Sequence, residues 1–189
     1  MKVLVIVGSG KIGGNTDQLC DAFAEGLAAA GHEVIKFHLG RKKVGPCTGC
    51  NVCRISGICA QNDDFEEGLD AFMDADMLVL STPLYFWSVS AHLKAWIDRL
   101  YSIGEKDPKG FYFTYPKKKV FLLATFADIS SHFYAFDLVE AFYHRLVRYM
   151  KWEDMGSYYA TGCGGSSMPR RIEDTKHLKA AFEIAQKIH

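Results

Sequence analysis

A segment rich in glycine and hydroxyl residues follows the first apolar run of the chain. Residues 3–7 lead directly into residues 8–16, which read GSGKIGGNT. A buried strand that enters such a turn and continues as a helix aims backbone N–H groups and the positive end of the helix dipole at one point, which suits a phosphate. The candidate phosphate-binding residues are Ser9, Lys11, Gly14, Asn15 and Thr16.

The glycine spacing alone does not identify the phosphate compound. Gly8, Gly10 and Gly13 match G-x-G-x-x-G, but a dinucleotide site also needs an acid about 20 positions later, at the end of the second strand. The second expected strand ends near Gly40 without an acid, and no Lys-Ser or Lys-Thr pair follows the glycines, as a triphosphate loop requires. One lysine among neutral donors favours a monophosphate. The alternative is a glycine-rich turn around an ordered water.

Four cysteines lie within thirteen residues, in the spacing C-x2-C-x2-C-x5-C: Cys47, Cys50, Cys53 and Cys59. Such close spacing suits a cubane iron–sulfur cluster, because each thiolate must reach a separate iron atom from one curling backbone. Structural zinc sites usually separate two C-x2-C pairs more widely. The segment therefore predicts a [4Fe–4S] cluster, with metal-free thiols, zinc or a disulfide as alternatives.

An aromatic segment follows the third apolar strand. It consists of Pro83, Leu84, Tyr85, Phe86 and Trp87. Successive aromatic side chains at a strand end pack poorly unless something flat lies against them, and an isoalloxazine ring is flat and apolar with polar edges. Ligands of open α/β sheets bind beyond the carboxyl ends of the strands, so we expect this segment and the glycine loop to meet there. Capping of the sheet or a subunit contact is the alternative.

Apolar periodicity predicts an alternation of strands and helices that positions these segments. We expect strands over residues 2–7, 33–39, 76–82, 119–125 and 154–161. We expect helices over residues 16–30, 63–74, 90–103, 131–150 and 172–188. This alternation predicts one α/β domain over residues 1–189, with a five-stranded parallel sheet covered on both faces.

Two segments interrupt the alternation, a cysteine-rich loop insertion at 45–62 and an aromatic loop at 104–117. In the helix over 131–150, the residues expected to face inward are Leu138, Phe142, Leu146 and Tyr149.

Composition narrows the classes of function. The 189 residues contain 22 Lys+Arg and 22 Asp+Glu, so the net charge is zero and no basic stripe indicates nucleic-acid binding. The apolar runs are shorter than a membrane span, and the N-terminal run enters a glycine turn, unlike a signal peptide. We therefore expect a cytoplasmic protein with reduced cysteines and without nucleic-acid or membrane partners.

Three motifs together resemble the flavodoxin-like NAD(P)H-dependent FMN reductases, and above all their iron–sulfur flavoprotein branch. The motifs are residues 8–16, Ser81-x-Pro83-Leu84-Tyr85-Phe86 and Leu93-Lys94-x-x-Ile97-Asp98-Arg99. The likeness covers about residues 2–103. It implies FMN, a strand order of 2-1-3-4-5 and a homodimer or homotetramer, and that branch ligates a [4Fe–4S] cluster with the same cysteine spacing.

The chain departs from the family pattern at two places. These reductases usually have proline and arginine where this chain has Gly10 and Lys11, and residues 125–130 lack the glycine-rich turn expected after the fourth strand. Lysine meets a phosphate as a point charge, without the bidentate fork of arginine.

The resemblance implies an FMN-dependent oxidoreductase that accepts hydride from NAD(P)H and reduces a quinone, a flavin or a similar small acceptor. Because the flavin carries the chemistry, we expect no catalytic side chain. The alternatives are an electron carrier of flavodoxin or iron–sulfur flavoprotein type between protein partners, and a redox or metal sensor that uses the cysteine loop. Cys163 is expected on the cofactor rim, as a reactive thiol or an ordinary loop cysteine. A lid over the ring or a dimer contact is expected from Phe111, Tyr112, Phe113 and Tyr115.

Overall fold

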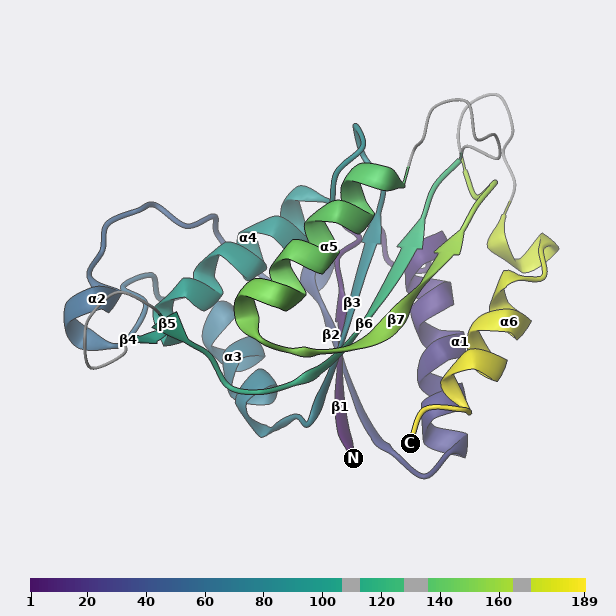
Figure 1. Cartoon of the computed structure of the whole chain (residues 1–189). Coiled ribbons are helices and arrows are strands. Elements are labelled where there is room, and N and C mark those ends of the chain that lie inside the picture. The colour runs from purple at the N-terminus through teal and green to yellow at the C-terminus, as the bar shows by residue number, and fades with distance from the viewer. Residues whose placement is uncertain (107–112, 128–135, 165–170) are drawn as a thin grey trace.

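The computed structural model describes residues 1–106, 113–127, 136–164 and 171–189. Its centre is a parallel sheet of five strands in the order β2-β1-β3-β6-β7 (Figure 1). The strands are β1 Lys2–Val7, β2 Glu33–His38, β3 Met77–Pro83, β6 Lys119–Thr125 and β7 Glu153–Ala160. Counted along this sheet alone the order is 2-1-3-4-5, so the predicted fold class and strand order are confirmed.

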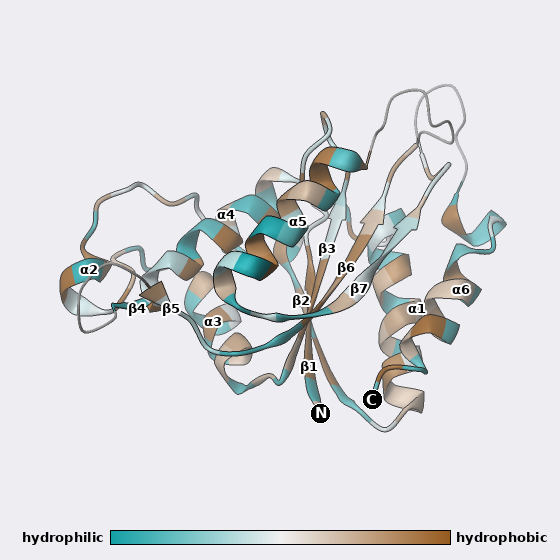
Figure 2. Ribbon diagram, in the orientation of Figure 1, coloured by the Kyte–Doolittle hydropathy of each residue, from teal (hydrophilic) through white to brown (hydrophobic). Residues whose placement is uncertain are grey.

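Helices cover both faces of the sheet (Figure 1). One face carries α1 Asn15–Ala29 and α6 His177–Ala185; the other carries α3 Phe65–Asp74, α4 Ala91–Arg99 and α5 Asp137–Met150. Alternate residues of β1 point to opposite faces. Val5 packs in the core under α1 and α6, whereas Leu4 and Ile6 pack in the core under the other three helices. Figure 2 shows the central strands in apolar brown, and α5 with both brown and teal residues, as an amphipathic helix requires.

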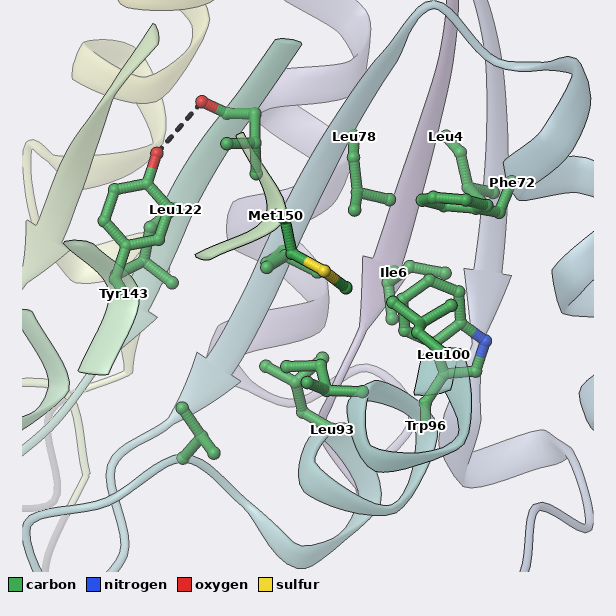
Figure 3. Packing of buried hydrophobic residues seen from close by; sticks show 14 of the residues in the cluster. Leu4, Ile6, Phe72, Leu78, Leu93, Trp96, Leu100, Leu122, Tyr143 and Met150 are labelled. Atoms are coloured by element: carbon green, nitrogen blue, oxygen red, sulfur yellow. Dashed lines mark hydrogen bonds between the residues drawn. The ribbon is translucent and has the colours of Figure 1, made fainter. Parts of the chain in front are cut away.

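The core beneath α3, α4 and α5 contains buried aromatic side chains with polar tips, among them Trp96 and Tyr143 (Figure 3). The Trp96 ring lies edge-on to Phe72, with 5.9 Å between ring centroids. The Tyr143 hydroxyl lies 2.9 Å from the carbonyl oxygen of Val120 and 2.7 Å from Oδ1 of Asp154. Tyr143 therefore ties α5 to β6 and β7.

The predicted inward face of α5 is correct for Phe142 and Leu146, which are partly buried against the core, and wrong for Leu138 and Tyr149. Leu138 and Tyr149 are 63% and 57% exposed. The buried residues of this helix are Val139, Tyr143, Val147 and Met150. The reason is Tyr143: its hydroxyl has buried partners, so its ring can occupy the core, which a choice of face by apolarity alone overlooks.

Short elements occur where loops were expected. The cysteine loop contains the helical turn α2 Cys53–Ser56, and the aromatic loop contains an antiparallel pair, β4 Glu105–Lys106 and β5 Phe113–Thr114. The short 3₁₀ helices are η1 Leu39–Arg41, η2 Leu100–Ile103 and η4 Ile172–Asp174. Because η4 ends before α6 begins, the last predicted helix is interrupted. Residues 131–135 of the predicted fourth helix lie outside the described residues. None of the described helices combines the length and apolarity that crossing a membrane requires.

Candidate functional site

The carboxyl ends of β1, β3 and β6 open into one pocket of about 400 Å³, a volume within the range of small-molecule sites. All five residues predicted from the glycine loop line it: Ser9, Lys11, Gly14, Asn15 and Thr16. From the aromatic segment it receives Pro83, Leu84 and Tyr85. No cofactor contact was predicted for four of its lining residues, Thr125, Phe126, Ala127 and Gly164, although residues 125–130 were expected near this edge.

The glycine loop presents the start of α1 to this pocket. The residue before the helix, Gly14, offers no side-chain cap, so the first N–H groups of α1 are open to an anion. The Ser9 hydroxyl accepts a hydrogen bond from the Lys11 N–H at 3.0 Å, which shapes the turn. Gly8 lies so close to β3 that an added Cβ would lie 2.3 Å from the carbonyl oxygen of Ser81. Gly8, which has no Cβ, therefore allows the loop to pack closely against β3.

Hydroxyl and amide side chains join the walls of the pocket. Oγ1 of Thr16 lies 2.6 Å from Oγ1 of Thr125, so the start of α1 is tied to the end of β6. Oδ1 of Asn15 accepts a hydrogen bond from the N–H of Ile172 at 3.2 Å. The signal for Thr125 in the sequence was a hydroxyl residue at the last position of an apolar strand.

A buried carboxylate, Asp17, lies beneath the glycine loop. It is 4% exposed and accepts a hydrogen bond from the Gly13 N–H at 2.7 Å. Nζ of Lys36, on β2, lies 2.6 Å from its Oδ1. Burial opposes ionisation of Asp17, but the ion pair with Lys36 and the hydrogen bond from Gly13 outweigh it and hold the pKa of the carboxyl below its ordinary value. This pair was not predicted from the sequence, where the only signal for it is an acid in the first turn of a helix.

The aromatic segment ends in a tight turn at the pocket mouth. The backbones of Tyr85 and Ser88 exchange two N–H···O hydrogen bonds of 3.1 Å. Between them, Phe86 and Trp87 have φ angles of 47° and 60°, a left-handed conformation that is strained for aromatic residues. These two side chains are 93% and 46% exposed and do not line the pocket. Their N–H groups have no backbone acceptor within the described part of the chain.

The four cysteines of the loop insertion lie apart from this pocket, in the segment around α2 at the left of Figure 1. All four thiols are free, and together they line a second pocket of about 90 Å³. Among the described residues, no three His, Cys, Asp or Glu side chains are placed to hold one metal ion. This arrangement is therefore not a preformed metal centre. Hydrogen bonds from the Val52 backbone and the Thr48 hydroxyl lower the pKa of the exposed Cys50 thiol.

Arg99, at the end of α4, fastens both ends of the cysteine loop. Its guanidinium is 1% exposed and lies 2.7 and 2.6 Å from the two carboxylate oxygens of Asp63. It also donates to the carbonyl oxygens of Gln61 and Gly45, at 3.2 and 3.4 Å. The motif that ends in Arg99 thus has a structural role in this chain.

Cys163 lines the first pocket but is buried, and burial raises the pKa of its thiol. Of the two expectations for Cys163, these properties favour an ordinary cysteine over a reactive thiol. Of the expected lid, Phe113 packs against Tyr101 and Tyr115 against Tyr149, at 5.4 and 5.8 Å between ring centroids. Neither lines the first pocket. The other two aromatic residues of the expected lid, and residues 128–130 of the expected turn, lie outside the described residues.

Comparison with known proteins gives both close relatives and a full-length structural match. An iron–sulfur flavoprotein of Archaeoglobus fulgidus is 37% identical over 113 residues, 59% of this chain and 51% of that protein. An FMN-dependent NADH:quinone oxidoreductase 1 of Pseudomonas syringae pv. tomato is 39% identical over 69 residues, 33% of each chain. A solved NAD(P)H:quinone oxidoreductase from Methanothermobacter marburgensis has a TM-score of 0.73 at 17% identity, covering 100% of this chain and 99% of that chain. That likeness shows the fold alone.

The chain spans about half the length of the iron–sulfur flavoprotein and about a third of the length of the Pseudomonas oxidoreductase. The model of the family described as flavodoxin-like fold, however, matches residues 1–183. The match covers nearly all of the chain and agrees with the observed strand order. This chain belongs to the flavodoxin-like family.

Proposed function

We propose that this chain is an FMN-dependent oxidoreductase that accepts hydride from NAD(P)H and reduces a quinone, a flavin or a similar small acceptor. One observation carries the proposal: the glycine loop and the aromatic segment, which are far apart in sequence, line a single pocket of about 400 Å³ at the carboxyl edge of a parallel sheet. Edges of this kind are where open α/β sheets bind their ligands. The similarity to an FMN-dependent NADH:quinone oxidoreductase of Pseudomonas syringae pv. tomato supports the same class of reaction.

The pocket residues fit a flavin mononucleotide. The uncapped start of α1 offers N–H groups, and Lys11 offers a positive charge, so a phosphate is held at this end. Pro83, Leu84 and Phe126 provide an apolar wall for a planar ring. In the turn between Tyr85 and Ser88, the N–H groups of Phe86 and Trp87 have no backbone acceptor among the described residues and are available to donate to the polar edge of the ring.

Bound FMN supplies the hydride chemistry, and the chain supplies binding and orientation. Lys11 neutralises part of the phosphate charge as a point charge. Phe126 and Cys163, both buried, keep water from the inner wall of the pocket. Tyr85 stands at the mouth, where an acceptor enters. No side-chain acid or base is assigned to the reaction.

The test is flavin binding followed by turnover. Protein stripped of flavin is titrated with FMN by fluorescence, and NADH or NADPH oxidation is then followed with menadione as acceptor. We expect Lys11→Met to weaken FMN binding by about tenfold, and Lys179→Met, which changes an exposed lysine on α6, to leave it unchanged. Failure of the wild-type protein to bind FMN contradicts the proposal.

A second candidate function is electron transfer between protein partners, and the cysteine loop favours it. Four free thiols share one pocket, and the relative from Archaeoglobus fulgidus is named an iron–sulfur flavoprotein. We propose that this loop closes around a [4Fe–4S] cluster. Iron and sulfide analysis of anaerobically purified protein tests this, with Cys53→Ala as the variant that should lose both elements. Flavin with neither iron nor sulfide in the wild-type protein contradicts it.

We also propose a cytoplasmic homodimer or homotetramer. Exposed apolar side chains on the cysteine loop, Ile55 and Ile58, are 93% and 69% exposed and support association. Light scattering on the purified protein measures the number of subunits, and a monomer would contradict the proposal.

A further inference from the structure

The buried carboxylate of Asp17 lies beside the glycine loop, and a negative charge is unusual next to a site that is proposed to bind an anion. It lies in the first turn of α1 and takes the Gly13 N–H, 2.7 Å away. A carboxylate at a helix N-terminus interacts with the same positive dipole end that favours a phosphate. Asp17 thus fixes the loop, but its charge opposes the ligand that the loop is proposed to bind.

The conformation that Asp17 fixes is one that the loop needs. Gly13 has a φ of +66°, which is left-handed backbone, and its N–H is directed to the carboxylate. On the other side of the loop, an added Cβ on Gly40 would lie 2.7 Å from the carbonyl oxygen of Ser9. The 3₁₀ helix η1, which directly follows β2, therefore packs on the glycine loop, and β2 is the strand that supplies Lys36.

Lys36 is placed to cancel the charge of Asp17. Its Nζ lies 2.6 Å from Oδ1 of Asp17 and also contacts Asp21. Burial disfavours the lysine cation, but the ion pairs with Asp17 and Asp21 outweigh it and raise the pKa of Lys36, so the amine is charged.

The other basic group near Asp17, His38, does not neutralise the charge of the carboxylate. Nε2 of His38 lies 3.4 Å from Oδ2 of Asp17, while Nδ1 accepts the Gly40 N–H at 3.0 Å. An accepting Nδ1 belongs to the neutral imidazole, and burial lowers the pKa of His38. Lys36 is therefore the charged partner of Asp17 within the described residues.

We propose that Lys36 is a positioning residue of the phosphate site: it neutralises Asp17, so that Asp17 can fix the glycine loop without repelling the phosphate of the flavin. The inference rests on the proposed function, because it assumes that the ligand of this loop is FMN. It assigns to the Asp17–Lys36 pair the preference of the pocket for FMN over riboflavin, which lacks the phosphate.

The test compares dissociation constants for FMN and riboflavin, measured by flavin fluorescence, in four variants. We expect Lys36→Met to weaken FMN binding by about tenfold, through the uncompensated charge of Asp17, and to leave riboflavin binding unchanged. Asp17→Asn keeps an oxygen acceptor for Gly13, and should bind FMN at least as tightly as wild type. The double variant should return to near the wild-type value. The control is Lys2→Met. Lys2 lies at the end of β1 away from the glycine loop, and its Nζ is 2.8 Å from the carboxylate of Asp74, so this variant should change neither dissociation constant.

Three results would overturn the inference: unchanged FMN binding by Lys36→Met, an equal loss of riboflavin binding by that variant, or no recovery in the double variant. If circular dichroism shows Lys36→Met to be unfolded, Asp17→Asn decides. Tighter or equal FMN binding by Asp17→Asn supports the inference, and weaker binding overturns it. A wild-type protein that binds neither flavin overturns the proposed function and this inference with it, and is recognised before any variant is compared.

Discussion

Asp63→Asn removes the carboxylate that pairs with the buried guanidinium of Arg99. In the folded protein the two groups are held by contacts of 2.7 and 2.6 Å. Asparagine keeps the size of the side chain and can still accept the Gly45 N–H, which now lies 2.9 Å from Asp63. The substitution therefore removes one charge beside a guanidinium that is 1% exposed, together with the second carboxylate oxygen, which accepts the Phe65 N–H at 3.1 Å.

The expected loss of unfolding free energy follows from what remains around Arg99. Removing one partner of a buried ion pair costs about 3–5 kcal/mol when the other charge is left alone. Here the guanidinium keeps the carbonyl oxygens of Gln61 and Gly45, and it lies 4.2 Å from the ring centroid of Phe65, a cation–π contact. Because of these contacts we reduce the expected loss to about 2–3 kcal/mol.

Urea unfolding followed by circular dichroism at pH 7 measures this loss. The matched control is Asp98→Asn on the same helix as Arg99, because Asp98 pairs with Lys94 at the surface, where such pairs contribute about 0.3–0.5 kcal/mol. Equal losses in the two variants would refute the reasoning.

The pH dependence gives a second check on Asp63. Burial opposes ionisation of this carboxyl, but hydrogen bonds from Arg99 and from the Gly45 and Phe65 N–H groups outweigh it and lower its pKa. A lowered pKa in the folded state gives stability that is present above the unfolded pKa of about 3.9 and is lost as the pH falls through the folded value. The difference between wild type and Asp63→Asn should therefore be full at neutral pH and shrink below about pH 4. A difference that does not depend on pH contradicts the ion-pair explanation.

Three further predictions concern the first pocket and the thiols. Gly8→Ala places a Cβ 2.3 Å from the carbonyl oxygen of Ser81 and should cost at least about 2 kcal/mol in urea unfolding; a loss below that of a surface substitution contradicts the close packing. Phe86→Gly relieves a φ of 47° and should stabilise the protein by about 1 kcal/mol, measured the same way, with destabilisation as the contrary result. Iodoacetamide at pH 7, followed by peptide mass spectrometry, should label Cys50 before Cys163, because the pKa of the first is lowered and that of the second is raised by burial.

Much of the fold was predictable because the positions of its strands and helices follow from the periodicity of apolar residues. Val3–Val7 is apolar throughout, as a strand covered on both faces must be, and the same pattern recurs in β3 and β6. The face of α5 was not predictable from apolarity, because the burial of Tyr143 depends on a carbonyl of β6 and a carboxylate of β7 that only the folded chain brings near its hydroxyl.

The candidate site was likewise predictable only in part. The meeting of the glycine loop with Pro83 and Tyr85 follows from the rule that carboxyl ends of parallel strands share one edge, and the structure places them in one pocket. The pairing of Asp17 with Lys36 joins two elements through a side-chain contact that no local pattern encodes. The left-handed turn at Phe86 runs against the preference of aromatic residues, so propensity could not indicate it.

One short helix links the two pockets. The N-cap of α4 is Ser90, whose hydroxyl accepts the Leu93 N–H and donates to the carbonyl oxygen of Gly8 in the glycine loop. Its last residue is Arg99, which fastens the cysteine loop. Nine residues at 1.5 Å each make α4 about 13 Å long, so its two ends hold the pockets at a fixed separation. The cysteine loop is also held by Arg54, which donates to the carbonyl oxygens of Tyr101 and Gly104, and by Cys59, which packs against the main core. The loop is therefore fixed to the end of α4 and to the segment that follows it.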